Sequence, residues 1–266
     1  MDKYKLGFLG CGNMACAIIS GVIKSGILPI DSIYAYDVST DACTAAHARF
    51  GIQAADNLNI LDNVDIVILA VKPIECERVA QAWATRLNGK GLISIVAGLS
   101  FDKLCVLFSD CTVLRVMPNV AAMCGESMTV LCDNTNFDLS KREFSEIMFN
   151  SIGKSLWIAE KHIDAVTGVS GCGPAYAFIM LDAMADAGVL HGLPRSAAIE
   201  LAAQTMLGAC AMQLSTKTHP AVLKDMVCSP GGSTIEAVVA LEQGGMRSAV
   251  INAVDAAVKK SKDMTK

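Results

Sequence analysis

A glycine-rich segment near the start of the chain places the strongest constraint on the fold. The run Leu9-Gly10-Cys11-Gly12-Asn13-Met14-Ala15 has the spacing Gly-x-Gly-x-x-Ala and lies between a short apolar run and a helical pattern. The first glycine permits a tight turn, the second lets the backbone approach a pyrophosphate, and the small third residue allows the helix to pack closely on the strand. Amides at the helix N-terminus are suited to bind the anion. The segment predicts a dinucleotide-binding turn; the alternative is an ordinary tight strand-to-helix turn.

Strand and helix patterns alternate through the first 160 residues. The apolar run Ile66-Val67-Ile68-Leu69-Ala70-Val71 is of the kind that parallel sheets bury on both faces. We expect strands at 5–10, 32–37, 65–71, 92–96, 112–117, 128–132 and 156–158, and helices at 13–25, 40–50, 75–87, 100–108 and 138–151. This alternation predicts right-handed βαβ units in a doubly wound parallel sheet of the Rossmann type.

The pattern changes near Lys161. From there to residue 266 the chain shows Ala-, Leu- and Met-rich helical periodicity, interrupted by Gly and Pro, and no strand pattern. We therefore expect a dinucleotide-binding domain over residues 1–160 and an all-helical domain over residues 161–266. The apolar runs are shorter than the roughly 20 residues that a membrane-spanning helix needs, and no signal-peptide pattern opens the chain, so a membrane protein is not expected.

Composition excludes several other classes of protein. The 266 residues are 53% hydrophobic and 18% charged with a net charge of −4, and both signs are scattered, so neither a disordered chain nor a nucleic-acid-binding protein is expected. The eleven cysteines and four histidines form no zinc-ligand spacing, so no metal site is expected. Most cysteines, including Cys16, Cys105 and Cys210, lie in apolar runs, which predicts reduced, buried thiols in a cytoplasmic protein.

Asp37 ends the second expected strand, where an acidic residue usually bonds the adenosine ribose. An acid there repels a 2′-phosphate, and no arginine is adjacent to it in sequence, so Asp37 favours NADH over NADPH; the alternative is that Asp37 only caps a strand or helix. The loops at residues 70–73 and 96–98 follow the third and fourth main strands and should line the nicotinamide half of the cofactor. Lys72 in the first loop is either a ligand contact or a solvated lysine.

The helical half contains one segment with a specific chemical pattern, Ser229-Pro230-Gly231-Gly232-Ser233-Thr234-Ile235-Glu236. Ser233 and Glu236 have capping-box spacing, so Ser233 is expected to cap a helix. Two glycines before it leave the first amides open to a carboxylate or phosphate. The alternative is a capped helix that binds nothing. Asn119 and the break at residues 170–174 are either aimed at a ligand cleft or structural.

Five segments resemble the pyrroline-5-carboxylate reductase family: residues 7–15, 70–73, 115–119, 164–176 and 223–235. The resemblance covers essentially the whole chain. It implies reduction of the cyclic imine Δ1-pyrroline-5-carboxylate to L-proline with NADH or NADPH, the last step of proline biosynthesis. It also implies a helical dimerisation domain, with homodimers often assembled into a decamer.

The resemblance also implies roles for individual residues. The substrate carboxylate would be held by Ser229, Gly232, Ser233 and Thr234, with the Thr234 hydroxyl near the imine nitrogen as the catalytic contact. The cofactor would be held by Gly10, Cys11, Gly12, Asn13, Met14, Asn57, Ala70, Val71, Lys72, Pro73, Val96, Ala97 and Gly98. Asp37 joins this set through its place after the second strand and not through the resemblance.

Three positions depart from the family pattern. Val120-Ala121 stands where the family usually has Thr-Pro, Cys172 where it has serine, and Asp37 where it often has a small or hydroxyl residue. Two rival functions remain. A β-hydroxyacid dehydrogenase would use a helical lysine, which is not found near residues 171–176. A dinucleotide sensor would have no need of the anion site at residues 229–234.

Overall fold

The computed structural model describes residues 4–265 and contains an eight-stranded sheet. Its strand order is β3-β2-β1-β4-β5-β6-β7-β8, and the strands β1 to β6 run parallel to one another. The bounds are β1 (Leu6–Leu9), β2 (Ile33–Tyr36), β3 (Gln53–Ala55), β4 (Ile66–Leu69), β5 (Gly91–Ser94), β6 (Thr112–Met117), β7 (Ser127–Cys132) and β8 (Gly153–Ile158). The first six strands have the doubly wound Rossmann order, which confirms the predicted fold class.

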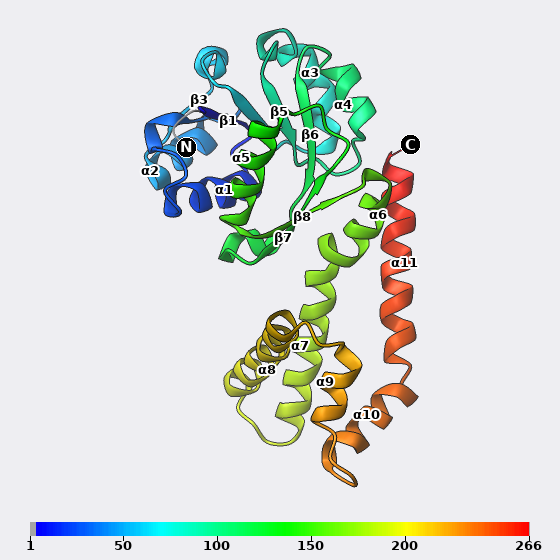
Figure 1. The fold of residues 1–266 in the computed structure, drawn as a ribbon. Helices are drawn as coiled ribbons and strands as arrows, with labels where there is room; N and C mark the ends of the chain where they lie inside the picture. The colour runs from blue at the N-terminus through cyan, green and yellow to red at the C-terminus, as the bar shows by residue number, and fades with distance from the viewer. Residues whose placement is uncertain (1–3, 266) are drawn as a thin grey trace. The chain divides into compact units, whose positions relative to one another are not determined.

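Helices cover both faces of this sheet (Figure 1). Alternate residues of β4 enter two separate cores: Ile66 and Ile68 pack in the core under α1, α2 and α5, and Val67 and Leu69 pack in the core under α3 and α4. The continuous apolar run of β4 is therefore explained by burial on both faces. The helices are α1 (Asn13–Lys24), α2 (Thr40–Phe50), α3 (Cys76–Trp83), α4 (Phe101–Leu107) and α5 (Leu139–Asn150).

The sheet differs from the expected one in two places. β7 runs antiparallel to β6, so the sheet is not wholly parallel. The reason is the short connection between them, which holds only the 3₁₀ helix η5 (Val120–Cys124), whereas a parallel crossover needs a dozen or more residues. The short edge strand β3 was not predicted, because its sequence Gln-Ala-Ala lacks the β-branched and aromatic residues typical of strands.

The end of the sheet is joined to the start of the helical region by a buried ion pair. The Arg115 guanidinium of β6 donates to Glu160 Oε1 at 2.7 Å, and the same oxygen accepts the Phe101 backbone N–H at 2.7 Å. Asn134 Nδ2 donates to Glu160 Oε2 at 2.6 Å. Burial acts to raise the pKa of Glu160, but the hydrogen bonds from Arg115, Phe101 and Asn134 outweigh it and lower that pKa.

The remaining elements form the helical region. They are η6 (Glu160–His162), α6 (Ile163–Val166), a π-helical segment η7 (Thr167–Gly171), α7 (Gly173–Leu190), α8 (Arg195–Thr216), α9 (Pro220–Met226), α10 (Ser233–Gln243) and α11 (Met246–Thr265). Residues 161–265 contain no strand, which confirms the all-helical prediction.

Contacts divide the chain into two units that differ from the expected boundary at residue 160. The first unit runs through residue 171 and includes the chain from residue 257 onward, and the second comprises residues 172–256. The end of α11 joins the first unit because the Ser261 hydroxyl donates to Asp164 Oδ1 at 2.6 Å and the Met264 backbone lies against Gly98.

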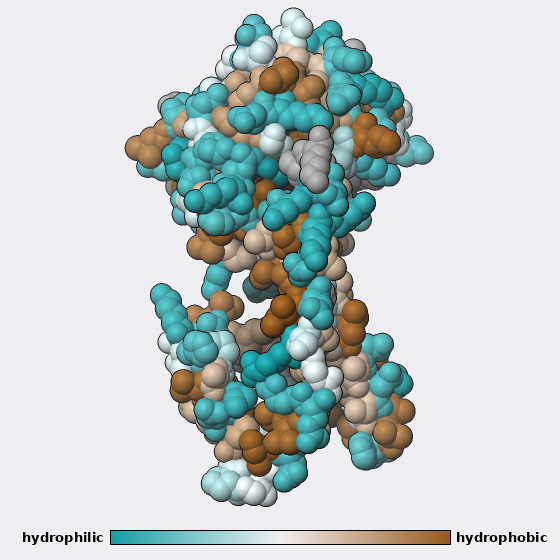
Figure 2. All heavy atoms as spheres, turned by 90° about the vertical axis from the view of Figure 1, so that its right-hand side faces the viewer, coloured by the Kyte–Doolittle hydropathy of each residue, from teal (hydrophilic) through white to brown (hydrophobic). Residues whose placement is uncertain are grey.

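The second unit has almost no interior of its own. Between residues 172 and 256 only Ala185, Ala198 and Ala202 are buried. Large apolar side chains such as Phe178, Ile179 and Leu201 are exposed, and apolar residues reach the surface of this unit in Figure 2. Exposed apolar area of this extent marks a surface that another protein chain covers. Within residues 4–265, no helix combines the length and apolar character needed to cross a membrane.

All eleven cysteines are free thiols, in agreement with the sequence prediction. Burial raises the pKa of Cys11 to about 12 and that of Cys76 to about 11, which makes these thiols unreactive. Cys16 and Cys105 are half-buried, and the predicted burial of Cys210 is wrong, because α8 lies in the unit with almost no interior. In the described part of the chain, no group of His, Cys, Asp or Glu is arranged to hold a metal ion.

Glu160→Gln should lower the free energy of unfolding by about 3 kcal/mol at pH 7, because it leaves the Arg115 guanidinium buried without its counter-charge. The lowered pKa of Glu160 stabilises the fold above the ordinary glutamate pKa of about 4.3, and this contribution is lost as the pH falls through the lowered value. The difference between wild type and variant in urea unfolding should therefore shrink in acid. Glu75→Gln, which breaks an exposed pair with Arg78, is the control and should cost less than about 1 kcal/mol. Equal losses in the two variants would contradict the assignment.

Candidate cofactor and substrate sites

The glycine-rich turn crosses directly between two strands. Gly10 follows β1 with φ +107°, and its N–H donates to the Tyr36 carbonyl oxygen of β2 at 2.8 Å. A Cβ atom on Gly10 would lie 2.5 Å from the Ala70 carbonyl oxygen at the end of β4. Only glycine fits this backbone conformation and this approach, so the tight-turn role predicted for Gly10 is confirmed.

The other two small residues of the motif have different surroundings. Gly12 is the N-cap of α1, and a Cβ atom there would meet nothing within 4 Å, so Gly12 leaves open space at the helix N-terminus. Ala15 is buried against the sheet, as the close packing of helix on strand requires. No side chain caps the first turn of α1, so its amides are available to an anion.

Asp37 fastens the glycine-rich turn to the end of β2. Its Oδ2 accepts the Cys11 backbone N–H at 2.8 Å, and its Oδ1 accepts the Ser39 N–H at 3.0 Å. The predicted placement of an acid at the end of β2, beside the glycine-rich turn, is confirmed. The two bonds also show that Asp37 has the structural capping role that the sequence left open.

A pocket of about 420 Å³ lies at this edge of the sheet. It brings together three segments that the sequence singled out: the glycine-rich turn, Asp37 and the loop after β4. Its lining includes Gly10, Gly12, Asp37, Ala70, Val71 and Lys72. The carboxyl ends of parallel strands meet at one edge of a sheet, which is why segments far apart in sequence meet here.

Sequence reasoning missed several lining residues. Tyr36 and Trp83 form one wall, with ring centroids 4.7 Å apart in an edge-on contact. Arg78 of α3 also lines the pocket, where its guanidinium pairs with Glu75 at 2.6 Å. No arginine is adjacent to Asp37 in sequence, but the fold brings Arg78, together with its partner Glu75, to the same pocket. In the sequence, the position of Arg78 five residues after Pro73 is the signal that could have placed it near this pocket.

The remaining predicted cofactor residues do not line this pocket. Asn57 follows β3 and accepts the Asn59 N–H at 3.0 Å as the N-cap of a 3₁₀ helix. Residues 96–98 follow β5 at the same edge, where Gly98 has φ +78°. Cys11, Asn13, Met14 and Pro73 are likewise outside the lining.

Asn119 has structural partners on two elements. Its Oδ1 accepts the Ala121 N–H at 3.2 Å, and its Nδ2 donates to the Ser170 carbonyl oxygen at 3.2 Å. Ser170 lies in the π-helical segment between α6 and α7, so the break expected at residues 170–174 is a local widening of the helix. Asn119 therefore joins the end of β6 to this segment.

The segment at residues 229–234 forms an open turn before α10. Gly231 has φ +68°, and Gly232 is the N-cap of α10 with an extended conformation. The predicted capping box is wrong: Ser233 is the first helical residue, and no side chain caps the helix. The left-handed turn at Gly231 moves the extended cap position one residue earlier than the pattern suggests. Ser229, Ser233 and Thr234 are exposed, and their side-chain hydroxyls make no hydrogen bond within residues 4–265.

Comparisons with known proteins agree with this architecture. A profile described as "NADP oxidoreductase coenzyme F420-dependent" matches residues 5–98, and one for pyrroline-5-carboxylate reductase dimerisation matches residues 160–264. The structure of a Plasmodium falciparum pyrroline carboxylate reductase with NADP bound superposes with a TM-score of 0.90 at 33% identity and covers 100% of both chains. The fold and the pocket define an oxidoreductase that uses NAD(P)H.

The relatives narrow this class to one family. A pyrroline-5-carboxylate reductase of Escherichia coli is 42% identical over the whole of both chains, and one of Arabidopsis thaliana is 38% identical over 99% of this chain and 96% of its own. A Coxiella burnetii pyrroline-5-carboxylate reductase superposes with a TM-score of 0.92 at 30% identity over 99% of both chains. The chain belongs to the pyrroline-5-carboxylate reductase family.

The two glycines of the turn should respond differently to substitution. Gly12→Ala should change the free energy of unfolding by less than about 1 kcal/mol and weaken NADPH binding, because its methyl group enters open space at the helix N-terminus. Gly10→Ala should destabilise the fold by at least about 1–3 kcal/mol through backbone strain alone. Urea unfolding and titration of NADPH fluorescence measure the two effects. A Gly12→Ala variant with unchanged NADPH affinity would remove this turn from the cofactor site.

Proposed function

We propose that this chain reduces Δ1-pyrroline-5-carboxylate to L-proline with NADH or NADPH, as the last step of proline biosynthesis. The observation that supports the proposal is that a pocket at the glycine-rich turn and an open turn before α10 both occur in a chain that matches pyrroline-5-carboxylate reductases over its whole length. The pocket is the candidate cofactor site, and the open turn is the candidate substrate site.

We assign the cofactor to the carboxyl edge of the sheet. The α1 amides after Gly10 would hold its pyrophosphate, with Cys11, Gly12, Asn13 and Met14 forming the surrounding backbone. The loops after β3, β4 and β5 would hold the rest through Asn57, Ala70, Val71, Lys72, Pro73, Val96, Ala97 and Gly98. The lining of the pocket supports the roles of Gly10, Gly12, Asp37 and residues 70–72 most directly. The bound cofactor supplies the hydride.

We assign the substrate carboxylate to the turn before α10. Uncapped amides and the free hydroxyls of Ser229, Ser233 and Thr234, together with the open backbone of Gly232, are suited to hold an anion. A protonated cyclic imine is already electrophilic, so the protein mainly has to hold its carbon in line with the hydride donor. The Thr234 hydroxyl, placed next to the imine nitrogen, would act as an orienting hydrogen-bond partner rather than a strong acid.

The assembly follows from the same division of roles. Residues 160–264 match the family's dimerisation region, and large apolar side chains of the second unit are exposed. Both observations support an oligomer. We propose that residues 1–160 bind the cofactor, that residues 161–266 bind the substrate and the partner chain, and that homodimers assemble into a decamer in the cytoplasm. Light scattering of the purified protein measures the size of the assembly.

Purified protein should oxidise NADH or NADPH only when the imine is present. Omitting pyrroline-5-carboxylate is the matched control. Tight cofactor binding without turnover would contradict the proposal and favour a dinucleotide sensor. Turnover with a 2-hydroxy or 3-hydroxy acid instead would favour a hydroxyacid dehydrogenase.

Asp37→Ser should shift the ratio of kcat/KM for NADPH over NADH upward by about tenfold, because it removes a carboxylate that repels a 2′-phosphate. Asp37→Asn also removes the charge and should give the same shift, although its single amide oxygen can accept only one of the two N–H groups, from Cys11 or Ser39, that the carboxylate accepts. Arg78→Gln should shift the ratio toward NADH, because Arg78 is a cation in the same pocket. Unchanged ratios in all three variants would place the adenosine ribose elsewhere.

Thr234→Ala should lower kcat/KM for the imine by about tenfold, which corresponds to the roughly 1–1.5 kcal/mol of one hydrogen bond, and leave the Kd for NADPH unchanged. Thr234→Ser retains the hydroxyl and should retain most of the activity. Steady-state kinetics at saturating cofactor gives kcat/KM for the imine in the Thr234→Ala and Thr234→Ser variants. Equal activity of all three proteins would remove Thr234 from the substrate site.

A further inference from the structure

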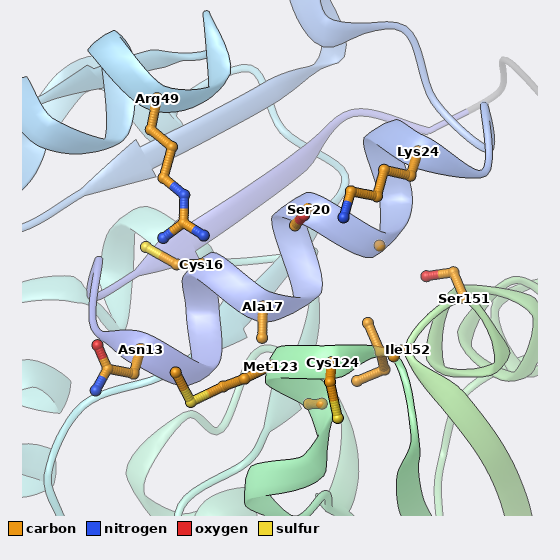
Figure 3. Close-up of a pocket in the computed structure, with 13 residues that line it drawn as sticks. Asn13, Cys16, Ala17, Ser20, Lys24, Arg49, Met123, Cys124, Ser151 and Ile152 are labelled. Atoms are coloured by element: carbon orange, nitrogen blue, oxygen red, sulfur yellow. The ribbon is translucent and has the colours of Figure 1, made fainter. Parts of the chain in front are cut away.

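A second pocket of about 300 Å³ lies in the first unit and shares no lining residue with the cofactor pocket. Its walls come from one side of α1, the end of α2, the 3₁₀ helix η5 and the turn between α5 and β8 (Figure 3). Asn13 is the one lining residue that is also assigned to the cofactor, there through its backbone.

Small residues on α1 create the space. Ala17 and Gly21 lie one turn apart on the side of the helix that faces the pocket. A Cβ atom on Gly21 would collide with Ile152 and with the Ser151 side chain, so glycine is what allows the turn before β8 to approach α1. Ala17, Ile152 and the exposed Met123 give the pocket an apolar wall.

The pocket is positively charged. Lys24 of α1 and Arg49 of α2 line it, and no Asp or Glu does. Neither cation has an ion-pair partner within 4.0 Å in the described part of the chain, and Arg49 instead stacks on the Phe50 ring at 4.9 Å. In Figure 3 the Arg49 guanidinium lies beside Cys16, and the Lys24 ammonium points toward Ser20. Burial raises the pKa of Cys16, and the nearby Arg49 charge acts against that rise.

Two neutral donors also line the pocket. The Asn13 amide and the Ser20 hydroxyl both line the pocket, and across residues 4–265 neither side chain has a hydrogen-bond partner. Two cations and two free donors around one hollow fit an anion with several oxygens better than a monocarboxylate, because each oxygen can accept a separate charge-assisted hydrogen bond.

We propose that this pocket binds a small organic phosphate monoester. At neutral pH such a group carries a charge of about −1.5 to −2, which matches Lys24 and Arg49 together. The apolar wall of Ala17, Met123 and Ile152 would contact the carbon part of the ligand, and the volume lies at the lower end of the range for small-molecule sites. The pocket is therefore a second binding site, and it does not depend on the reaction proposed above.

The probe is sn-glycerol 3-phosphate, titrated calorimetrically at constant ionic strength in the presence of saturating NADPH. The NADPH occupies the glycine-rich turn, so binding there is suppressed. Wild-type protein should bind the probe at one site per chain and more tightly than it binds inorganic phosphate. A Lys24→Gln/Arg49→Gln double variant should bind it at least tenfold more weakly while keeping its NADPH affinity and its activity without the probe.

Lys154→Gln is the matched control. It removes one positive charge from an exposed residue of β8 that is outside the pocket, and it should leave the affinity unchanged. Absence of saturable binding to the wild type, or equal affinity in the double variant, would overturn the proposal. If the protein binds the probe without NADPH but not with saturating NADPH, the phosphate binds at the glycine-rich turn instead, and the proposal is overturned. Equal affinities for glycerol 3-phosphate, inorganic phosphate and sulfate would reduce the pocket to a simple anion site.

Discussion

The close passage of Gly10 between two strands is the constraint on which the rest of the first unit depends. Its N–H bonds to the Tyr36 carbonyl oxygen on one side, and the Ala70 N–H donates to the Leu9 carbonyl oxygen at 2.8 Å on the other. The chain leaves the sheet here at φ +107°, directly under the Ala70 carbonyl. β1 lies between β2 and β4, so this crossing sets where α1 begins and where all the segments of the cofactor pocket converge.

The same crossing makes Asp37 a residue with two tasks. Its carboxylate accepts two backbone N–H groups, one of them from Cys11 in the turn itself, so the charge that would meet the cofactor is also part of the scaffold. Arg78 brings a positive charge into the same pocket from α3. The charge in this pocket is therefore set by Asp37 together with Lys72 and the Arg78–Glu75 pair, rather than by the acid alone.

The two units are built on different physical principles. The first has apolar cores on both faces of its sheet. Polar contacts, namely the Arg115–Glu160 pair and the bond from Asn119 to Ser170, join β6 and the residues after it to the segment 160–171 of the same unit. The second buries only alanines and exposes long apolar side chains along its helices. A chain segment of this kind gains its hydrophobic stabilisation from a partner, which agrees with the dimerisation region found there.

The sequence by itself determined the elements whose signals are local: the glycine-rich turn, the parallel strands with continuous apolar runs, and the switch to helices after residue 160. Tertiary structure decided what depends on neighbours distant in the chain. It reversed β7, whose connection from β6 is too short for a crossover, and it moved the cap of α10 from Ser233 to Gly232 through the left-handed turn at Gly231. It also brought Arg78 into the same pocket as Asp37, and Arg49 into the same pocket as Lys24. Spacing along a chain reveals residues that share one element, whereas a charged pocket depends on how separate elements pack.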